Sequence, residues 1–257
     1  MNYFFKDNLS VLVNEDTFTY IKSLPESYVD LIVLDPPYFL SSGGITNRAG
    51  RKASVNKGEW DNPNRINVEY FYNNLIKECK RILKREGTLW IFGTYHNIFL
   101  AGYYLKNYDF KILNNIAWIK ENPAENLSKN VLTHANETII WARRDKKSRH
   151  FYNYKEMFAE KNKQLTDVWI TPTIDRKEKD YGYHPTQKPL ALIKRIIRCS
   201  AKKDSIVLDP FVGSGTTVVA CRQEGIKCIG IDKEKKYLST AKKRLIRVND
   251  NYIDKIY

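Results

Sequence analysis

The sequence predicts an α/β fold built on a mostly parallel β-sheet. Short, continuous apolar runs such as 31–34 and 88–93 recur along the chain, as expected for strands buried on both faces. Segments with helical periodicity alternate with these runs, which indicates parallel βαβ units. Two of the runs end in an aspartate, Asp35 and Asp209, each followed by proline. Their carboxylates are therefore expected at the carboxyl ends of strands, where open α/β sheets bind ligands.

The first half of the chain begins with a predicted strand at 9–16 and a short helix that ends before Pro25. The run 31–34 must stop at Asp35, because the two prolines that follow have no N–H group to donate to a sheet. The remaining elements of this half are a helix at 68–84 capped by Gly87, a strand at 88–93 and a helix from about 96 to 105.

In the second half, strands are predicted at 111–120 and 137–144. An amphipathic helix follows Pro189, and a buried strand then ends at Asp209. A glycine-containing loop leads into a helix that begins at Thr216, and the last predicted strand ends at Asp232.

Two segments depart from this alternation. Residues 41–65 are rich in Gly, Ser and Asn and carry five basic residues, which suits either a mobile arm that closes on nucleic acid or a solvated surface loop. Residues 145–183 are basic, aromatic and poorly periodic, which is typical of an insertion with its own task. The basic run at 143–149 suits a solvated face or phosphate contact better than base-specific contact.

Charge and composition narrow the class of protein. The 257 residues suit one domain, and 43 Lys+Arg against 29 Asp+Glu leave a net charge of +14. This excess favours a nucleic acid over a membrane as partner, although a basic surface that serves only solubility remains an alternative. The polar N-terminus and the absence of a long apolar run predict a cytoplasmic protein. Four cysteines without zinc-like spacing predict reduced thiols and no metal site.

The segment Asp35-Pro36-Pro37-Tyr38 forms a stiff elbow with a specific chemical use. An exocyclic amine of adenine or cytosine is a poor nucleophile, because its lone pair is delocalised into the ring. The Asp35 carboxylate and the Pro36 carbonyl can accept its two hydrogens, and Tyr38 can stack on a base taken out of its helix. A turn that merely ends a strand is the alternative for this short motif.

A second chemical stretch runs from Ser205 to Gly225. Small residues after Asp209 let the backbone approach a ligand, and the following helix N-terminus supplies N–H donors. Asp232 ends the next strand, where an acid can bind a ribose diol. Together these features predict a pocket for an adenosyl group, with a glycine-rich turn without ligand as the alternative. The lone His184 is interpreted as a structural residue.

Four motifs in the order DPPY, HPTQKP, DPFVGSGT and IGID resemble the β group of DNA amino-methyltransferases. The resemblance covers nearly the whole chain. It implies a Rossmann-like fold with a mostly parallel seven-stranded sheet, helices on both faces and an antiparallel hairpin at one edge. It also implies one domain spanning 1–257, with the catalytic motif first and the cofactor motif last, a mobile loop at about 41–65 and a target-recognition insertion at about 145–183.

The resemblance further implies roles for individual residues, with S-adenosylmethionine as cofactor. Asp35, Pro36, Pro37 and Tyr38 would form the catalytic site for the amine and its base. Asp232 would hold the ribose hydroxyls, and Thr186 and Lys188 the methionine carboxylate. The other cofactor-binding residues would be Asp209, Pro210, Phe211, Gly213, Ser214, Gly215 and Thr216, with Pro210 and Phe211 packed on the adenine.

The segments DPPYFLSSGGI, SVNKGEW, KILNNIAW, NPAENLS and ETIIWARR are similar to those of the DpnA type, the second adenine methylases of GATC restriction systems. This implies N6 methylation of adenine in GATC within double-stranded DNA, and it leaves open whether single-stranded DNA is also a substrate. It further implies functional association with a restriction endonuclease and a second methylase. A homodimer follows from analogy with relatives.

Other functions stay open at this point. Cytosine N4 methylation uses the same machinery, although Asp before Pro-Pro favours adenine. RNA and protein-glutamine methylases usually have Asn at the position of Asp35 and the cofactor motif first. A non-catalytic DNA-binding subunit would be expected to have lost one of the two motifs, and both are intact.

Overall fold

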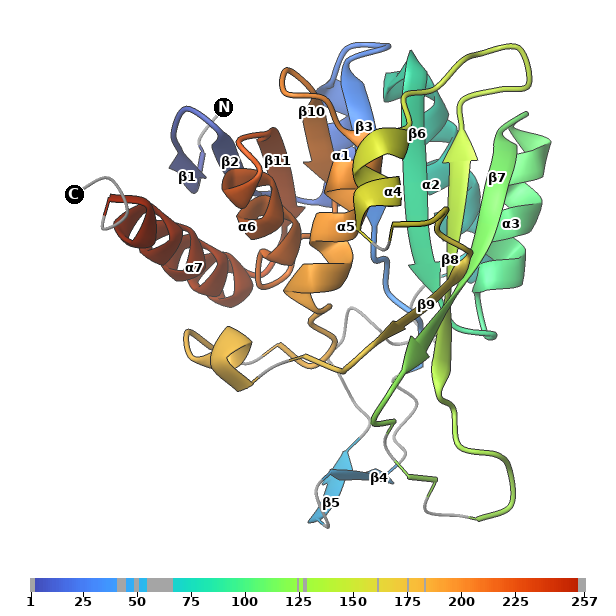
Figure 1. The fold of residues 1–257 in the computed structure, drawn as a ribbon, viewed down its shortest axis with the longest axis vertical. Helices are drawn as coiled ribbons and strands as arrows, with labels where there is room; N and C mark the ends of the chain where they lie inside the picture. The colour runs from blue at the N-terminus through green and yellow to red at the C-terminus, as the bar shows by residue number, and fades with distance from the viewer. Residues whose placement is uncertain are drawn as a thin grey trace.

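A nine-stranded sheet forms the centre of the computed structural model (Figure 1). The structure describes residues 3–40, 45–48, 51–54, 67–123, 125–126, 129–160, 162–174, 176–182 and 184–253. The strands lie in the order β1 (Phe5–Lys6), β2 (Ser10–Asn14), β11 (Lys227–Asp232), β10 (Ile206–Asp209), β3 (Val29–Leu34), β6 (Leu83–Gly93), β8 (Asn136–Arg143), β7 (Lys111–Lys120) and β9 (Val168–Thr171).

The sheet is mostly parallel, as predicted. Strands β2, β11, β10, β3 and β6 run parallel to one another, and β8 is antiparallel to both β6 and β7. The expected hairpin at 111–120 and 137–144 is therefore confirmed. The expected number of seven strands is wrong by two, because the short strands β1 and β9 extend the two edges of the sheet.

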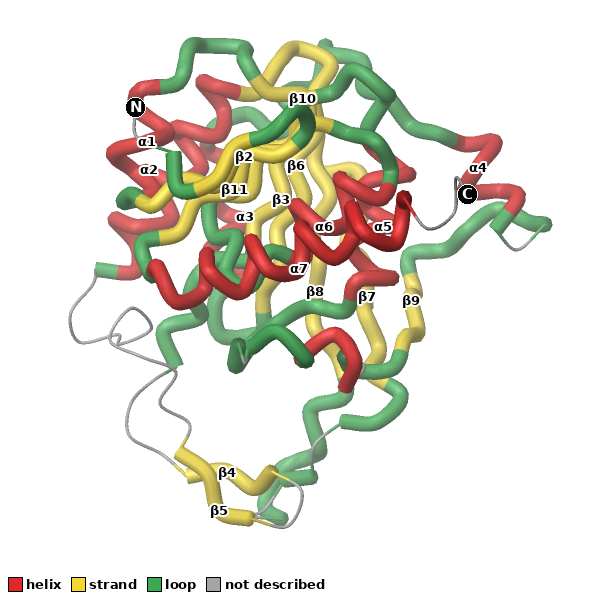
Figure 2. The backbone as a smooth tube through the Cα atoms, turned by 90° about the vertical axis from the view of Figure 1, so that its left-hand side faces the viewer, coloured by secondary structure: helices red, strands yellow, loops and turns green. Residues whose placement is uncertain are grey.

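Helices cover both faces of this sheet, each with its own hydrophobic core. One face carries α1 (Thr17–Ser23), α2 (Val68–Ile82) and α3 (Ile98–Asn107). The other carries α4 (Tyr154–Ala159), α5 (Leu190–Ser200), α6 (Thr216–Gln223) and α7 (Lys235–Ile253). Figure 2 shows α1 and α2 on one side of the strands and α5 and α6 on the other. Among the described residues, no helix is both long and apolar enough to span a membrane.

The end of α2 differs from the prediction. The helix stops at Ile82, and Leu83 already has an extended backbone and begins β6, so Gly87 is not a helix cap. Gly87 instead lies where β6 approaches β3 closely. A Cβ atom at this position would lie 2.8 Å from the Asp30 carbonyl oxygen, which explains the glycine.

The two irregular segments contain some secondary structure. Most of the predicted arm at 41–65 lies outside the described residues, but β4 (Ile45–Arg48) and β5 (Arg51–Ser54) form an antiparallel hairpin where only a loop was expected. The segment 145–183 contributes α4, β9 and a short 3₁₀ helix, η3 (Arg176–Lys179). Strand β9 was not predicted, because it is short and lies in a segment without clear periodicity.

Candidate active site

The two aspartate motifs meet at one edge of the sheet. Strands β3 and β10 are parallel neighbours, with Leu31 paired to Val207 and Ile32 to Leu208. Asp209 is the last residue of β10, and Asp35 follows directly after β3. The chain leaves the sheet at Asp35 because Pro36 cannot donate to the ladder. Both carboxylates therefore lie at the carboxyl edge, as predicted.

A cavity of about 540 Å³ opens at this edge, within the size range of small-molecule and cofactor sites. It joins the elbow after β3 to the end of β11. The predicted site residues that line it are Asp35, Pro36, Pro37, Tyr38, Thr186, Pro210, Phe211 and Asp232. The sequence motifs that lie far apart in the chain are thus brought to one cavity.

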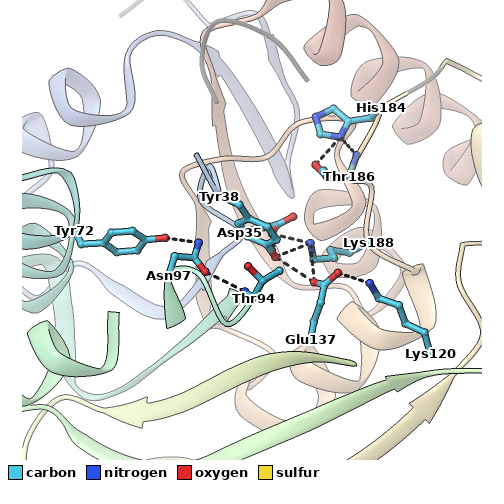
Figure 3. A network of polar contacts seen from close by, with 10 residues as sticks. All are labelled: Asp35, Tyr38, Tyr72, Thr94, Asn97, Lys120, Glu137, His184, Thr186 and Lys188. Carbon is cyan, nitrogen blue, oxygen red and sulfur yellow. Dashed lines mark hydrogen bonds and ion pairs between the residues drawn. The ribbon is translucent and has the colours of Figure 1, made fainter. Parts of the chain in front are cut away.

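The elbow belongs to a buried polar network (Figure 3). The Tyr38 hydroxyl donates to Oδ1 of Asp35 at 3.0 Å and lies 3.2 Å from Oε2 of Glu137. The Lys188 ammonium contacts Asp35 Oδ1 at 2.8 Å, the Tyr38 hydroxyl at 3.1 Å and Glu137 Oε2 at 3.4 Å. Lys120 completes the network with a 2.7 Å ion pair to Oε1 of Glu137.

Burial and charge act against each other in this network. Burial raises the pKa of Asp35, although Lys188 opposes this shift. Burial would also raise the pKa of Glu137, but Lys188 and Lys120 outweigh it and lower that pKa to about 2. Burial would lower the pKa of Lys188, but Asp35 and Glu137 outweigh it and raise that pKa. Glu137 is therefore a carboxylate and Lys188 an ammonium at neutral pH.

The loop after β10 is held by its own contacts. Oδ1 of Asp209 accepts the Phe211 N–H at 3.0 Å, and burial raises the pKa of Asp209 to about 7. The Ser214 hydroxyl donates to the Gln187 side chain at 2.9 Å. Gly215, the residue just before α6, has φ of 85°, a left-handed conformation that favours glycine.

Asp232, at the end of β11, faces the same cavity. Its two carboxylate oxygens accept the backbone N–H groups of Gly213 at 3.0 Å and Glu234 at 2.8 Å. Burial raises the pKa of Asp232 to about 6, with the two N–H donors opposing the shift. Each carboxylate oxygen retains a further lone pair, so the group can still accept hydroxyl donors from the cavity.

Not every predicted residue reaches the cavity. Asp209 is buried and is not among the lining residues, and neither are Gly213, Ser214 and Gly215 of the loop after β10 or Thr216 at the start of α6. Lys188 was expected beside the methionine carboxylate of a cofactor, whereas in the structure its ammonium contacts Asp35 and Glu137. His184 packs edge-on against Tyr237 with ring centroids 4.3 Å apart, and both residues line the cavity.

Sequence reasoning missed Glu137, Lys120 and Tyr237. A signal existed for Glu137, which is a charged residue just before the apolar run 139–142 of β8. Because β8 is antiparallel to β6, its beginning lies at the carboxyl edge of β6, with Thr138 paired to Gly93. No comparable signal marks Tyr237, which lies on an ordinary amphipathic helix.

The basic run at 143–149 lies at the opposite end of the sheet, because Arg143, the last residue of β8, pairs with Lys111, the first residue of β7. Arg144 donates to the Ser27 hydroxyl at 2.7 Å and to the Leu83 carbonyl at 2.6 Å. Arg143 donates to the Lys146 carbonyl at 3.0 Å. These contacts give the two arginines structural roles away from the cavity.

Comparison with known proteins gives consistent matches. Type II methyltransferase M2.DpnII of Streptococcus pneumoniae is 47% identical to this chain, over 96% of this chain and 93% of the relative. M2.LlaDCHI of Lactococcus lactis subsp. cremoris is 48% identical over 95% of this chain and 91% of the relative. M2.MboI of Moraxella bovis is 44% identical over 88% of this chain and 83% of the relative.

Solved structures of methyltransferases also resemble this chain. The M1.HpyAVI–SAM complex has a TM-score of 0.69 and 28% identity, covering 92% of this chain and 99% of that one. The cytosine-N4-specific PvuII DNA methyltransferase has a TM-score of 0.73 at 17% identity, over 95% of this chain and 90% of that one, and so shares the fold alone. A family model described as DNA methylase matches residues 29–243. The chain therefore belongs to this family of DNA methylases.

Proposed function

We propose that this protein transfers a methyl group from S-adenosylmethionine to the N6 amine of adenine in GATC, as a methylase of a restriction–modification system. The relatives named as Type II methyltransferases M2.DpnII and M2.MboI support this assignment. The observation that carries it is the Asp35 carboxylate, fixed by Tyr38 and Lys188 on the wall of the cavity that Asp232 also lines.

The elbow prepares the amine for transfer. Asp35 and the Pro36 carbonyl accept its two hydrogens, which makes the nitrogen lone pair available. Tyr38 lines the cavity and offers a ring on which an extruded adenine can stack. Because the methyl acceptor and donor are held side by side, most of the rate gain comes from their positioning and from the exclusion of water.

The cofactor-binding residues fit S-adenosylmethionine. The Asp232 carboxylate would accept the ribose hydroxyls, and Pro210 and Phe211 would pack on the adenine. The backbone of 213–216 and the side chain of Thr186 would approach the methionine half. When bound, the cofactor supplies a methyl group on a sulfonium, which is an excellent leaving group. All four cysteines are buried, and none of them is among the described residues that line the cavity, in keeping with direct transfer.

The substrate and setting follow from the same assignment. The substrate is double-stranded DNA, with activity on single strands to be tested, and the net charge of +14 favours its binding. The protein acts as one cytoplasmic domain, with the arm at 41–65 and the insertion at 145–183 reading the target. It forms a homodimer and works beside a restriction endonuclease and a second methylase.

One assay tests the proposal. The protein is incubated with labelled S-adenosylmethionine and unmethylated genomic DNA, in single- and double-stranded form, and the product is analysed as nucleosides and by sequencing of modified sites. N6-methyladenine confined to GATC supports the proposal. N4-methylcytosine would retain the fold and mechanism but replace the substrate. Absence of DNA methylation despite cofactor binding would exclude the proposed activity.

An Asp35→Ala variant gives the control for the site. It is expected to lose turnover, while its cofactor affinity stays within a few-fold of the wild type, because Asp232 and the loop after β10 are untouched. Methylation at a rate near that of the wild type would show that Asp35 does not activate the amine.

A further inference from the structure

The two oxygens of the Asp35 carboxylate have different surroundings. Lys188 Nζ lies 2.8 Å from Oδ1, and the Tyr38 hydroxyl donates to the same atom at 3.0 Å. Neither contact involves Oδ2. Among the described residues, none donates a hydrogen bond to Oδ2, and Asp35 lines the cavity, so this oxygen can accept from a ligand.

Lys188 is fixed from several directions. Its side chain is almost fully buried, and Nζ lies 3.4 Å from Oε2 of Glu137. The ammonium also lies 5.1 Å from the ring centre of Tyr38 and 5.3 Å from that of Phe92. Lys120 contacts the other oxygen of Glu137 at 2.7 Å. The network thus alternates negative and positive side chains, in the order Asp35, Lys188, Glu137 and Lys120 (Figure 3). These four residues come from four separate segments of the chain.

This arrangement compensates for the burial of the catalytic carboxylate. A buried aspartate without a cationic partner takes up a proton, and a protonated oxygen is a poor acceptor for an amine hydrogen. The groups that face Asp35 are Lys188 on the segment before α5, Glu137 on β8, Tyr38 on its own loop and Asp209 on β10. Lys188 is the only cation among these four.

We propose that Lys188 and Glu137 are positioning residues for methyl transfer. Lys188 binds Oδ1 of Asp35 and favours the ionised form of the carboxylate, so that Oδ2 accepts a hydrogen of the target amine. Glu137, oriented by Lys120, holds Lys188 in place. This inference rests on the proposed function, and it assigns Lys188 to the catalytic carboxylate rather than to the carboxylate of the cofactor.

Four variants test the inference: Lys188→Met, Lys188→Arg, Glu137→Gln and Lys84→Met. The last is a matched control, because Lys84 forms a 2.8 Å ion pair with Asp30 at the opposite end of β3. Single-turnover methyl transfer is measured from about pH 5.5 to 9, and the dissociation constant of S-adenosylmethionine is measured by calorimetry. Thermal unfolding identifies any variant that does not fold.

Loss of Lys188 should raise the pKa of Asp35 and move the acidic limb of the rate profile to higher pH. Lys188→Met is expected to lower the rate at about pH 6.5 by on the order of 100-fold, a loss that shrinks above about pH 8, with cofactor affinity within threefold of the wild type. Glu137→Gln keeps the shape and removes a charge that raises the pKa of Asp35, so it should move the acidic limb the other way, to lower pH. It should also lower the rate several-fold above about pH 8, because Lys188 loses a partner. Lys188→Arg should restore part of the rate, and Lys84→Met should behave as the wild type.

Two results would overturn the inference. A tenfold or greater loss of cofactor affinity in Lys188→Met with an unshifted pH profile would place Lys188 at the cofactor. An equal loss of rate at every pH in both Lys188→Met and Glu137→Gln would show a purely structural role. If Lys188→Met does not fold, Glu137→Gln alone decides through its pH profile. The wild type is assayed first, so a failure of the proposed function appears as absent methylation before any variant is compared.

Discussion

The backbone N–H of Gly213 donates to Oδ2 of Asp232 at 3.0 Å, which joins the loop after β10 to the end of β11. The Glu234 N–H donates to the other oxygen at 2.8 Å, so the carboxylate is oriented by donors from two segments. The loop and the predicted ribose-binding acid therefore form one unit. The charge state of Asp232 should consequently affect how this unit binds a cofactor.

Cofactor affinity is expected to rise with pH. In the folded protein the pKa of Asp232 is about 6, above its usual value, so the group is protonated at pH 5 and ionised near pH 7. Hydroxyl donors of a ribose favour the ionised form. Only the ionised fraction binds well, so the affinity for S-adenosylmethionine should increase roughly tenfold between about pH 5 and 6.8. Calorimetric titration of Asp232→Asn should give weak binding that changes little with pH, whereas a flat profile for the wild type would contradict this role.

Alanine substitutions at two glycines allow the energetic cost of backbone strain to be compared with that of steric overlap. Gly215 and Gly225 both have positive φ, but a Cβ atom at Gly215 would lie 2.5 Å from the Ala241 Cβ, whereas none of the described atoms lies within 4 Å at Gly225. Gly225→Ala should therefore lower the free energy of unfolding by about 1–2 kcal/mol through strain alone. Gly215→Ala should cost at least about 3 kcal/mol, because α7 must move as well. Urea denaturation measures both, and equal losses would refute the steric explanation.

Arg244 connects α7 to the loop after β10. Its buried guanidinium donates to the Ser214 carbonyl at 2.8 Å and to the Thr216 hydroxyl at 3.1 Å. Removing a charged donor from a buried acceptor costs about 1.5–3 kcal/mol. Arg244→Met should lower the free energy of unfolding by this amount and weaken cofactor binding several-fold, because Ser214 loses its support. Lys243→Met, at an exposed neighbouring position, is the control. Unchanged cofactor affinity in a destabilised Arg244→Met would mean that Arg244 supports only the fold.

The parts of the site that sequence could predict are those set by local chemistry. The elbow at Asp35 follows from an apolar run and two prolines, and the loop at 213–216 from its glycines. Both motifs ended their strands where expected, so their meeting at one edge followed from the parallel order of β3 and β10.

The polar network could not be predicted in this way, because it depends on contacts between distant segments. Tyr38 and Glu137 are 99 residues apart, and Tyr38 and Lys188 are 150 apart. Whether Glu137 faces the elbow is decided by the register of β8 against β6, and a shift of one residue would turn its side chain to the other face. The wrong assignment of Gly87 has a similar origin, since its environment is the Asp30 carbonyl on another strand.

The position of β8 also predicts which basic residues meet DNA. The connection between β7 and β8 lies at the carboxyl edge with Asp35, because Trp118 pairs with Glu137 there. Lys129 is an exposed residue of this connection, whereas the exposed Lys147 follows β8 at the opposite end of the sheet. DNA must reach Asp35, and at physiological salt a charge acts over only about 8 Å.

Lys129→Glu should therefore weaken DNA binding several-fold and reduce the slope of the logarithm of the binding constant against the logarithm of salt concentration by about 1. Lys147→Glu carries the same change of charge and should stay within about twofold of the wild type at physiological salt, because its position is screened from DNA at the carboxyl edge. Fluorescence anisotropy with a GATC duplex at several salt concentrations compares the two. Equal losses would mean that net charge alone governs affinity, and a larger loss for Lys147→Glu would place DNA at the other end of the sheet, away from Asp35.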